Sequence, residues 1–587
     1  MTDVPGYRHL REPGHAFLNG ARGSGKSMIF RYLEPDCQLL EKQCRIQDLP
    51  FIGLYISNKG PNAIPTELAF DSLTPANILF NEHALSLHVL KHAFSSLEKK
   101  VVPHVEGDGP YIRLKELFRE VLIYRLQLLG WEPTKDFDEE TSNAAEIFKK
   151  INSVLDGISY QLGRYIKGQI ANRDTATYSG PIIGFSDFVA PLFSAMVERE
   201  VFGKAKIFLL MDDADEMPLR RTEILNNWIF ARTTGFLSIK AATAFKYPTF
   251  LTTSNRRIET PHDFADINIS DIYTSDKYQG YKTRVSQICE RRIRRSQIGG
   301  DIKEMFPTDT QQDEKIKQIY NELVNDWDEN GRGARARDDG YRYATAEYIT
   351  QLGGSRKQSG KFLYAGFDNL VDLSSGVVRD FLDAATAMYD LACQKAKSEA
   401  VDVVPSAIQS QVSRVRGDEK IANIANELKS IRNHRDGDVI AVRNLIAGLG
   451  SLFKEILRSD RAERRVFSFA ISDEPDEELV RIINLAIELG LIQTSTIGRK
   501  EGFGRTRLYV LTRQIAPAFN LDPSGFAGYK FLTSRKIWEL MGSPTRTANI
   551  LRTRSAGYFT EDNNADLFAV EPTPLGAKAQ ATKGTQE

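Results

Sequence analysis

Short runs of apolar and β-branched residues recur through the first half of the chain. Four of them are continuous, as expected of strands buried on both faces, and the fifth alternates apolar and polar positions. Together they predict an α/β core around a parallel sheet. Its predicted strands are residues 16–18, 51–56, 206–211, 249–254 and 266–270.

A long segment with helical periodicity separates the second run from the third. About 150 residues lie between them, whereas one crossover connection between parallel strands needs only roughly a dozen or more. Apolar positions recur at helical spacing at 85–97, 111–129 and 144–166. We therefore expect a helical insertion at about 85–175 within the sheet-forming region.

The first run leads into Gly20-x-x-x-x-Gly25-Lys26-Ser27, the Walker A pattern that binds nucleotide phosphates. The strand before it and the helical spacing after it are the context that this pattern requires, which disfavours a chance glycine-rich turn. Backbone N–H groups would cradle the phosphates of ATP, and Lys26 would contact the β- and γ-phosphates. The residues predicted to bind the nucleotide are Gly20, Ala21, Arg22, Gly23, Ser24, Gly25, Lys26, Ser27 and Met28.

The third run ends in a cluster of acids, Asp212, Asp213, Asp215 and Glu216. Ligands gather at the carboxyl ends of parallel strands, so Asp212 should lie near Ser27 and share a Mg²⁺ ion with its hydroxyl. We favour this Walker B interpretation over an acidic surface turn. Asp213 and Glu216 are then the candidates for orienting the attacking water, with Asp215 as a further acid within reach.

The order of these motifs, followed by a strand that ends on Asn255, resembles AAA+ ATPases, in which such a polar residue is sensor 1. Residues 376–384 contain the Gly-x-x-Arg-x-x-Leu pattern of sensor 2 in the origin-recognition and replication-initiator clade. The resemblance implies that Arg379, on a helical lid, contacts the γ-phosphate; the alternative is a solvated arginine on an amphipathic helix. Initiator-type ATPases usually have Glu where this chain has Asp213, so ATP binding is a safer expectation than fast hydrolysis.

The C-terminal part of the chain mixes both kinds of pattern. Helical spacing at 438–457 and 477–489 flanks an alternating run at 466–471, and the runs 492–496 and 506–511 enclose a loop rich in Gly, Lys and Arg. Helices followed by a basic hairpin predict a winged helix, which the initiator clade also carries after its lid. The candidate DNA contacts are Arg499, Lys500, Arg505 and Arg507.

Two segments lack residues that could anchor them in a core. We expect 330–340 to be a mobile linker and the chain after about 572 to be a disordered tail. The predicted organisation is an ATPase core at 1–300, a helical lid at 301–400, a helical linker and winged helix at 401–535, and a C-terminal extension at 536–587.

Composition narrows the classes of partner. Lys+Arg and Asp+Glu both number 77, so no overall field draws the chain towards nucleic acid or a membrane. The four cysteines lack the spacing of a metal site or a disulfide framework. No apolar run approaches the roughly 20 residues of a membrane helix. We expect a cytoplasmic protein without a membrane partner.

Two functions stay open. The first is an initiator-like AAA+ ATPase that uses ATP and Mg²⁺, whose nucleotide state controls association with double-stranded DNA through the wing or with a partner, and which could oligomerise. The second resembles the STAND ATPases, as a nucleotide switch that controls a protein effector, for example in antiviral defence. The basic hairpin favours the first, whereas the neutral net charge and the acidic segment 473–478 before the second helix favour the other.

Overall fold

The structure is a computed structural model of the 587-residue chain. It describes residues 7–59, 74–105, 107–133, 140–171, 177–244, 247–269, 278–296, 300–330, 336–352, 361–429, 434–459, 465–498, 505–524 and 528–543. Arg499 and Lys500 of the predicted hairpin loop, residues 331–335 of the predicted linker and the predicted tail lie outside the described residues.

A five-stranded parallel sheet forms the core of the N-terminal half, as predicted. Its strand order is β2-β4-β5-β1-β6. Nearly every side chain of β2, β4 and β5 is buried. Burial on both faces explains why β2 and β4 are apolar runs in the sequence. The strands are β1 (Ala16–Asn19), β2 (Phe51–Ser57), β4 (Lys206–Asp212), β5 (Leu237–Thr243) and β6 (Ala265–Asn268).

The strand between β4 and β1 is not the one that the sequence predicted. β5 occupies that place, whereas 249–254 forms only an isolated bridge between Leu251 and Arg257. The Phe250 ring packs beside the Phe17 ring of β1, with the centroids 5.6 Å apart. Asn255 is exposed and lies in a turn at φ 58°, so its predicted position at the end of a sheet strand was wrong.

The apolar pattern of the sequence does not predict β5, because polar residues interrupt this strand. Lys240 is fully buried, and its Nζ donates to the backbone oxygens of His9 and Glu12 at 3.0 and 2.8 Å. Ser238 Oγ accepts a hydrogen bond from the backbone N–H of Gly14 at 3.0 Å. The segment before β1 therefore satisfies polar groups that interrupt an otherwise apolar strand, and no local pattern announces this pairing.

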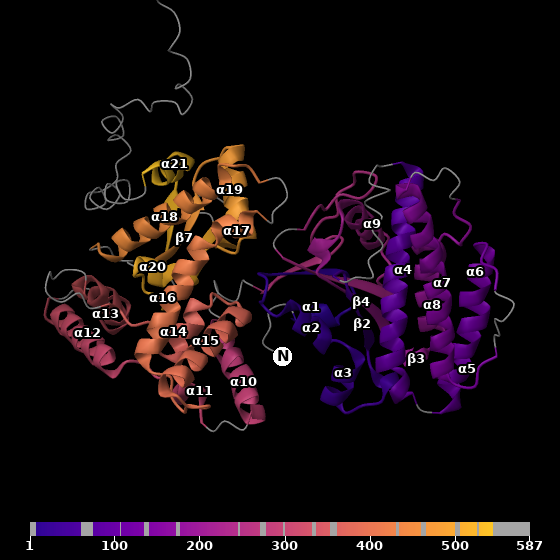
Figure 1. Ribbon diagram of the computed structural model, residues 1–587, viewed down its shortest axis with the longest axis horizontal. Helices are drawn as coiled ribbons and strands as arrows, with labels where there is room; N and C mark the ends of the chain where they lie inside the picture. The colour runs from indigo at the N-terminus through magenta and orange to yellow at the C-terminus, as the bar shows by residue number, and fades with distance from the viewer. Residues whose placement is uncertain are drawn as a thin grey trace, which may run out of the picture.

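Helices cover the sheet, and the predicted insertion extends from it (Figure 1). Helix α4 packs on both β2 and α7, so it lies between the sheet and the rest of the insertion. The insertion comprises α4 (Pro75–Lys100), η3 (Val102–His104), α5 (Asp108–Glu116), the π-helical η4 (Leu117–Ile123), α6 (Tyr124–Leu128) and α7 (Ala144–Ile170). The other elements of this half are α1 (Tyr7–Arg11), α2 (Lys26–Tyr32), α3 (Pro35–Lys42), η1 (Ile46–Asp48), η5 (Phe185–Val189), α8 (Ala190–Glu198), β3 (Val201–Lys204), η6 (Ala214–Glu216) and α9 (Leu219–Phe230).

The segment predicted as the lid, 301–400, is helical. It contains α11 (Ile302–Met305), α12 (Thr310–Asn330), α13 (Ala336–Leu352), α14 (Phe367–Leu373) and α15 (Val378–Ala396). Helix α10 (Tyr278–Ser296) fell within the predicted ATPase core, but it packs on α11 and α14, so we group it with the lid. Residues 336–340 of the predicted linker belong to α13, which corrects that part of the prediction. Gly340 lies so close to α12 that a Cβ there would meet Val324 Cγ2 at 2.8 Å, so this glycine permits helix packing rather than a loop.

We call residues 406–543 the C-terminal unit. Its four-stranded sheet has the order β10-β7-β9-β8, with β7 antiparallel to β9 and parallel to β10. The order α18-β7-α19-β8-β9 is the one expected for a winged helix, and β10 was not predicted. The unit contains α16 (Ser406–Ala422), α17 (Ile424–Leu428), α18 (Asp438–Leu457), β7 (Val466–Ile471), α19 (Glu477–Glu488), β8 (Ile492–Gly498), β9 (Arg505–Leu511), η8 (Arg513–Ile515), α20 (Ala516–Phe519), β10 (Gly528–Leu532) and α21 (Ser534–Gly542).

The lid and the C-terminal unit form one lobe, and the parallel sheet with the insertion forms the other (Figure 1). Apolar side chains of α2, the lid and the C-terminal unit belong to one continuous buried cluster, so the lobes are joined by packing as well as by the chain. Among the described residues, no helix is both long enough and apolar enough to span a bilayer.

Candidate nucleotide site

The predicted Walker A segment has its strand, turn and helix. β1 ends at Asn19, α2 begins at Lys26, and the turn between them holds Gly23 at φ 85° and Gly25 at φ 101°, angles that side chains disfavour. Ser24 Oγ is buried without a hydrogen-bond partner among the described residues. At the start of α2, the Ser27 and Met28 side chains are exposed. The loop therefore offers backbone and hydroxyl donors to an anionic ligand.

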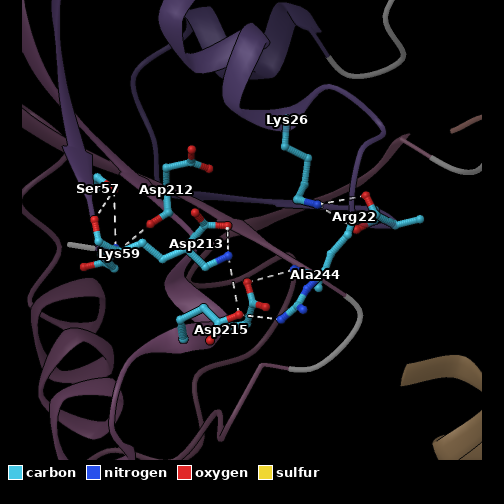
Figure 2. Close-up of polar contacts among 12 residues, drawn as sticks. Arg22, Lys26, Ser57, Lys59, Asp212, Asp213, Asp215 and Ala244 are labelled. Atoms are coloured by element: carbon cyan, nitrogen blue, oxygen red, sulfur yellow. Dashed lines mark hydrogen bonds and ion pairs between the residues drawn. The ribbon is translucent and has the colours of Figure 1, made fainter. Parts of the chain in front are cut away.

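Lys26 is folded back onto this loop. Its Nζ donates to the backbone oxygens of Gly20 and Ala21 at 2.8 and 3.0 Å, and its side chain is buried (Figure 2). Burial lowers the pKa of Lys26, while the nearby carboxylates, led by Asp215 and Asp212, act against that shift. Charged phosphate oxygens would be stronger hydrogen-bond acceptors for the Lys26 ammonium than these neutral carbonyl oxygens are.

Asp212 ends β4 with one oxygen held and one left open. Tyr55 Oη donates to Asp212 Oδ2 at 2.6 Å, and Asn58 Nδ2 donates to the Asp212 backbone oxygen at 2.7 Å. Asp212 Oδ1 is buried and has no hydrogen-bond partner in the described part of the chain. A hard cation such as Mg²⁺ would satisfy this orphaned carboxylate oxygen.

The donor set fits a nucleotide-bound metal rather than an all-protein metal centre. Within the described ranges, no three or more His, Cys, Asp and Glu side chains converge on one point. Asp212 and the Ser27 hydroxyl would hold Mg²⁺, and phosphate oxygens and water would complete its shell, as is common for this ion. When bound there, Mg²⁺ would neutralise charge on the β- and γ-phosphates.

Two cations reach the acids that follow Asp212 (Figure 2). Lys59 Nζ lies 3.2 Å from Asp213 Oδ1 and 3.5 Å from Glu216 Oε1. Arg22, from the Walker A loop, forms an ion pair with Glu216. Both predicted water-orienting acids are therefore already paired, and phosphate groups would compete for the same cations.

Asp215 has a different place. Its Oδ1 accepts a hydrogen bond from the Ala244 backbone N–H at 2.9 Å, directly after β5 (Figure 2). Burial raises the pKa of Asp215, and this backbone hydrogen bond partly opposes the rise. Asp215 thus ties the turn after β4 to the end of β5.

Side chains at the ends of β1 and β5 form a polar chain with Asp266 of β6. Asn19 Nδ2 donates to Asp266 Oδ1 at 2.5 Å, and the Thr243 hydroxyl donates to Asn19 Oδ1. Thr243 ends β5, which follows β4 in the chain, and this is the role that the sequence had given to the strand before Asn255. The structure therefore brings Thr243, and not Asn255, to the carboxyl edge of the sheet beside the Walker motifs.

The lid reaches the Walker A loop through its backbone. The Arg379 N–H, in the first turn of α15, donates to the Gly23 oxygen at 3.2 Å. A Cβ on Gly23 would meet Arg379 Cβ at 2.8 Å and Val377 Cγ1 at 3.0 Å. The Arg379 side chain is exposed. The predicted sensor-2 residue thus lies beside the predicted phosphate loop.

A known protein family and several solved structures match this chain. A family model described as ORC-CDC6-like matches residues 2–531. The chain belongs to the ORC-CDC6-like family. No curated protein matches it. Among solved structures, the Orc1 protein of Aeropyrum pernix in complex with DNA is 10% identical at a TM-score of 0.22, covering 88% of this chain and 91% of that one. Drosophila ORC bound to DNA is 10% identical at a TM-score of 0.20, covering 87% and 92%.

Strands β8 and β9 form the predicted hairpin of this ORC-CDC6-like chain. Arg505 begins β9, and the Arg507 side chain on the same strand is exposed. Sequence reasoning missed the polar residues that support the site from β2, namely Tyr55, Asn58 and Lys59. Their signal was available, because polar residues at the carboxyl end of a buried strand lie at the ligand edge of such a sheet.

Proposed function

We propose that the chain is an ATP-binding and ATP-hydrolysing initiator-like protein whose nucleotide state controls its association with duplex DNA. The contact between the Arg379 N–H and the Gly23 oxygen carries this proposal, because it places the lid on the loop that would hold the phosphates. Arg379 would contact the γ-phosphate, Asp213 or Glu216 would orient water, and Ser27 with Asp212 would hold Mg²⁺.

A buried clamp connects the lid to the hairpin. Ser375 Oγ accepts a hydrogen bond from the Arg513 N–H at 2.6 Å, just after β9, and the Ser375 backbone oxygen accepts one from Gln493 Nε2 of β8 at 3.0 Å. Ser375 lies in the turn before α15, and Asp380 of α15 accepts a hydrogen bond from Gln514. A movement of α15 relative to Gly23 would therefore be passed directly to the base of the hairpin.

The surface of the C-terminal unit favours contact with phosphates over reading of bases. The exposed positions of α19 are Glu477, Val480, Asn484 and Glu488, with no cation among them. Helix α21 also contacts the start of α19, since Trp538 Nε1 donates to Asp476 Oδ2 at 2.8 Å. An acidic helix is unsuited to a DNA groove, so we assign DNA contact to the basic hairpin.

Duplex binding by the purified full chain tests this function. Affinity is measured over a series of salt concentrations with ATP or ADP and Mg²⁺, beside molecular mass and phosphate release. We expect tighter binding in one nucleotide state and a salt slope of about −0.9 per neutralised phosphate. Arg507→Ala should make that slope less steep. The control is Arg45→Ala, which changes an exposed arginine of the other lobe and should leave the slope unchanged. A duplex affinity that depends neither on the bound nucleotide nor on the salt concentration would refute the proposal.

The acidic face of α19 favours a second candidate, a STAND-like nucleotide switch that acts on a protein effector. In such a switch the clamp on Ser375 would hold the C-terminal unit until nucleotide exchange released it. The same measurements separate the two functions. The switch predicts a nucleotide-dependent change of shape or mass without appreciable duplex affinity at any salt concentration.

A further inference from the structure

Tyr55 links two motifs of the nucleotide site without belonging to either. It lies on β2, which pairs in parallel with β4 so that Ser57 is opposite Asp212. From two positions earlier, the Tyr55 hydroxyl donates to Asp212 Oδ2 at 2.6 Å.

The Tyr55 ring is itself held from the Walker A side. The Arg31 guanidinium, on α2, lies 3.5 Å from the ring centroid, and Arg31 Nη1 lies 3.2 Å from a carboxylate oxygen of Glu34, a residue with a buried side chain. A cation over the ring face adds attraction to the packing. The phenol therefore has little freedom to turn away from Asp212.

Asp212 is consequently restrained at its side chain and at its backbone. Its backbone oxygen accepts hydrogen bonds from Asn58 Nδ2 at 2.7 Å and from the Asn58 N–H at 3.2 Å. Its Oδ2 accepts from Tyr55, and only Oδ1 is left, buried and without a partner among the described residues. An orphaned buried carboxylate oxygen is costly unless a ligand completes it.

We infer that Tyr55 is a positioning residue for the metal site: it occupies Asp212 Oδ2 so that Oδ1 is presented to the Mg²⁺ ion of the bound nucleotide. The inference rests on the proposed ATP binding. Partners that orient a metal-ligating side chain typically change metal affinity by about 10- to 100-fold when they are removed. Without the phenol, Asp212 Oδ2 would lose its partner and the carboxylate could rotate.

Tyr55→Phe removes the hydroxyl and keeps the ring under Arg31. Nucleotide affinity of the full chain is measured over a Mg²⁺ series and in a chelator. We expect the half-saturating Mg²⁺ concentration to rise about tenfold, with the metal-free affinity unchanged. The control is Tyr178→Phe, another half-buried tyrosine, whose hydroxyl donates to the Pro181 oxygen at 3.0 Å; its Mg²⁺ requirement should equal that of the wild type.

A double variant distinguishes positioning from general loosening. In an Asp212→Asn background, Tyr55→Phe should add no further change in Mg²⁺ requirement, because the group that it positions no longer ligates as a carboxylate. The inference is overturned, while ATP binding stands, by either of two results. One is a Tyr55→Phe variant with the wild-type Mg²⁺ requirement, and the other is a variant that loses nucleotide affinity equally with and without Mg²⁺. A wild-type chain whose nucleotide affinity ignores Mg²⁺ overturns both the metal site and the role of Tyr55.

Discussion

The Arg379 N–H donates to the Gly23 oxygen across the boundary between the lid and the Walker A loop, at 3.2 Å. This bond uses the backbone alone, so it fixes where α15 begins without using the guanidinium. The Arg379 side chain is exposed, so the backbone and the side chain of Arg379 can be tested separately.

Arg379→Ala should reduce the preference for ATP over ADP, measured as the ratio of the two affinities, by about tenfold or more. The reason is that the lost charge-assisted contact to the γ-phosphate is worth roughly 1.5–3 kcal/mol. The variant keeps the backbone bond to Gly23. Lys395→Ala, at the far end of α15, serves as the control and should retain the wild-type ratio. Equal discrimination in both variants would make Arg379 an ordinary surface arginine.

Gly23→Ala should displace the lid even though Arg379 is intact. The added Cβ would meet Arg379 Cβ at 2.8 Å, and φ 85° is strained for alanine. Limited proteolysis with ATP and with ADP should then give the same pattern. A variant that keeps the wild-type nucleotide-dependent pattern would show that α15 does not need its present distance from the loop.

Ser375→Ala should uncouple the hairpin from the nucleotide. The substitution removes the acceptor of the Arg513 N–H while leaving the residues of the Walker A loop in place. We expect unchanged ATP affinity and a loss of the difference in hydrogen exchange of β8–β9 between ATP and ADP. Ser413→Ala, a buried serine whose hydroxyl donates within its own helix, controls for the loss of a hydroxyl. A persisting ATP–ADP difference in Ser375→Ala would exclude the clamp as the connection.

Asp213→Asn should reduce ATP hydrolysis by about 10²-fold, the lower range for a positioned general base, and spare nucleotide binding. Asp215→Asn is the matched control. It retains an oxygen that can accept the Ala244 N–H, so hydrolysis should stay near the wild-type rate. If phosphate release slows only in the Asp215 variant, the role of orienting the water moves to Asp215. If it slows in neither variant, Glu216 is the next candidate.

Stability should fall as the pH drops from about 6.5 towards 4. Burial lowers the pKa of His15 and of His83 from 6.5 to about 4. In this window the unfolded chain binds protons that the folded chain does not, so protonation favours unfolding. Each histidine contributes up to about 1.4 kcal/mol per pH unit.

Urea unfolding at several pH values measures this dependence. His15→Gln should flatten it by removing one of the buried imidazoles, whereas His262→Gln, at an exposed site, should not. If both variants follow the wild-type curve, His15 does not contribute to the acid sensitivity.

The sequence by itself determined the parts of this protein that depend on local chemistry. The Walker A loop needs glycines, a lysine and a hydroxyl in order, and the buried strands β1, β2 and β4 need continuous apolar residues, so both can be read along the chain. The insertion and the β8–β9 hairpin likewise follow from periodicity, whereas the helical lid followed from the family resemblance. The family resemblance rested on the same short motifs.

Tertiary structure decided what depends on partners that are distant in the chain. β5 was missed because Lys240 is solvated by the carbonyls of His9 and Glu12, more than 220 positions away, and not by its neighbours. Because β5 was missed, the sequence assigned Asn255 to the edge of the sheet where the structure has Thr243. Tyr55 of the neighbouring strand takes Asp212 Oδ2, while Oδ1 has no partner among the described residues. The bond from the Arg379 N–H to the Gly23 oxygen likewise joins residues far apart in the chain. Such pairings are set by register and packing, which no local pattern encodes.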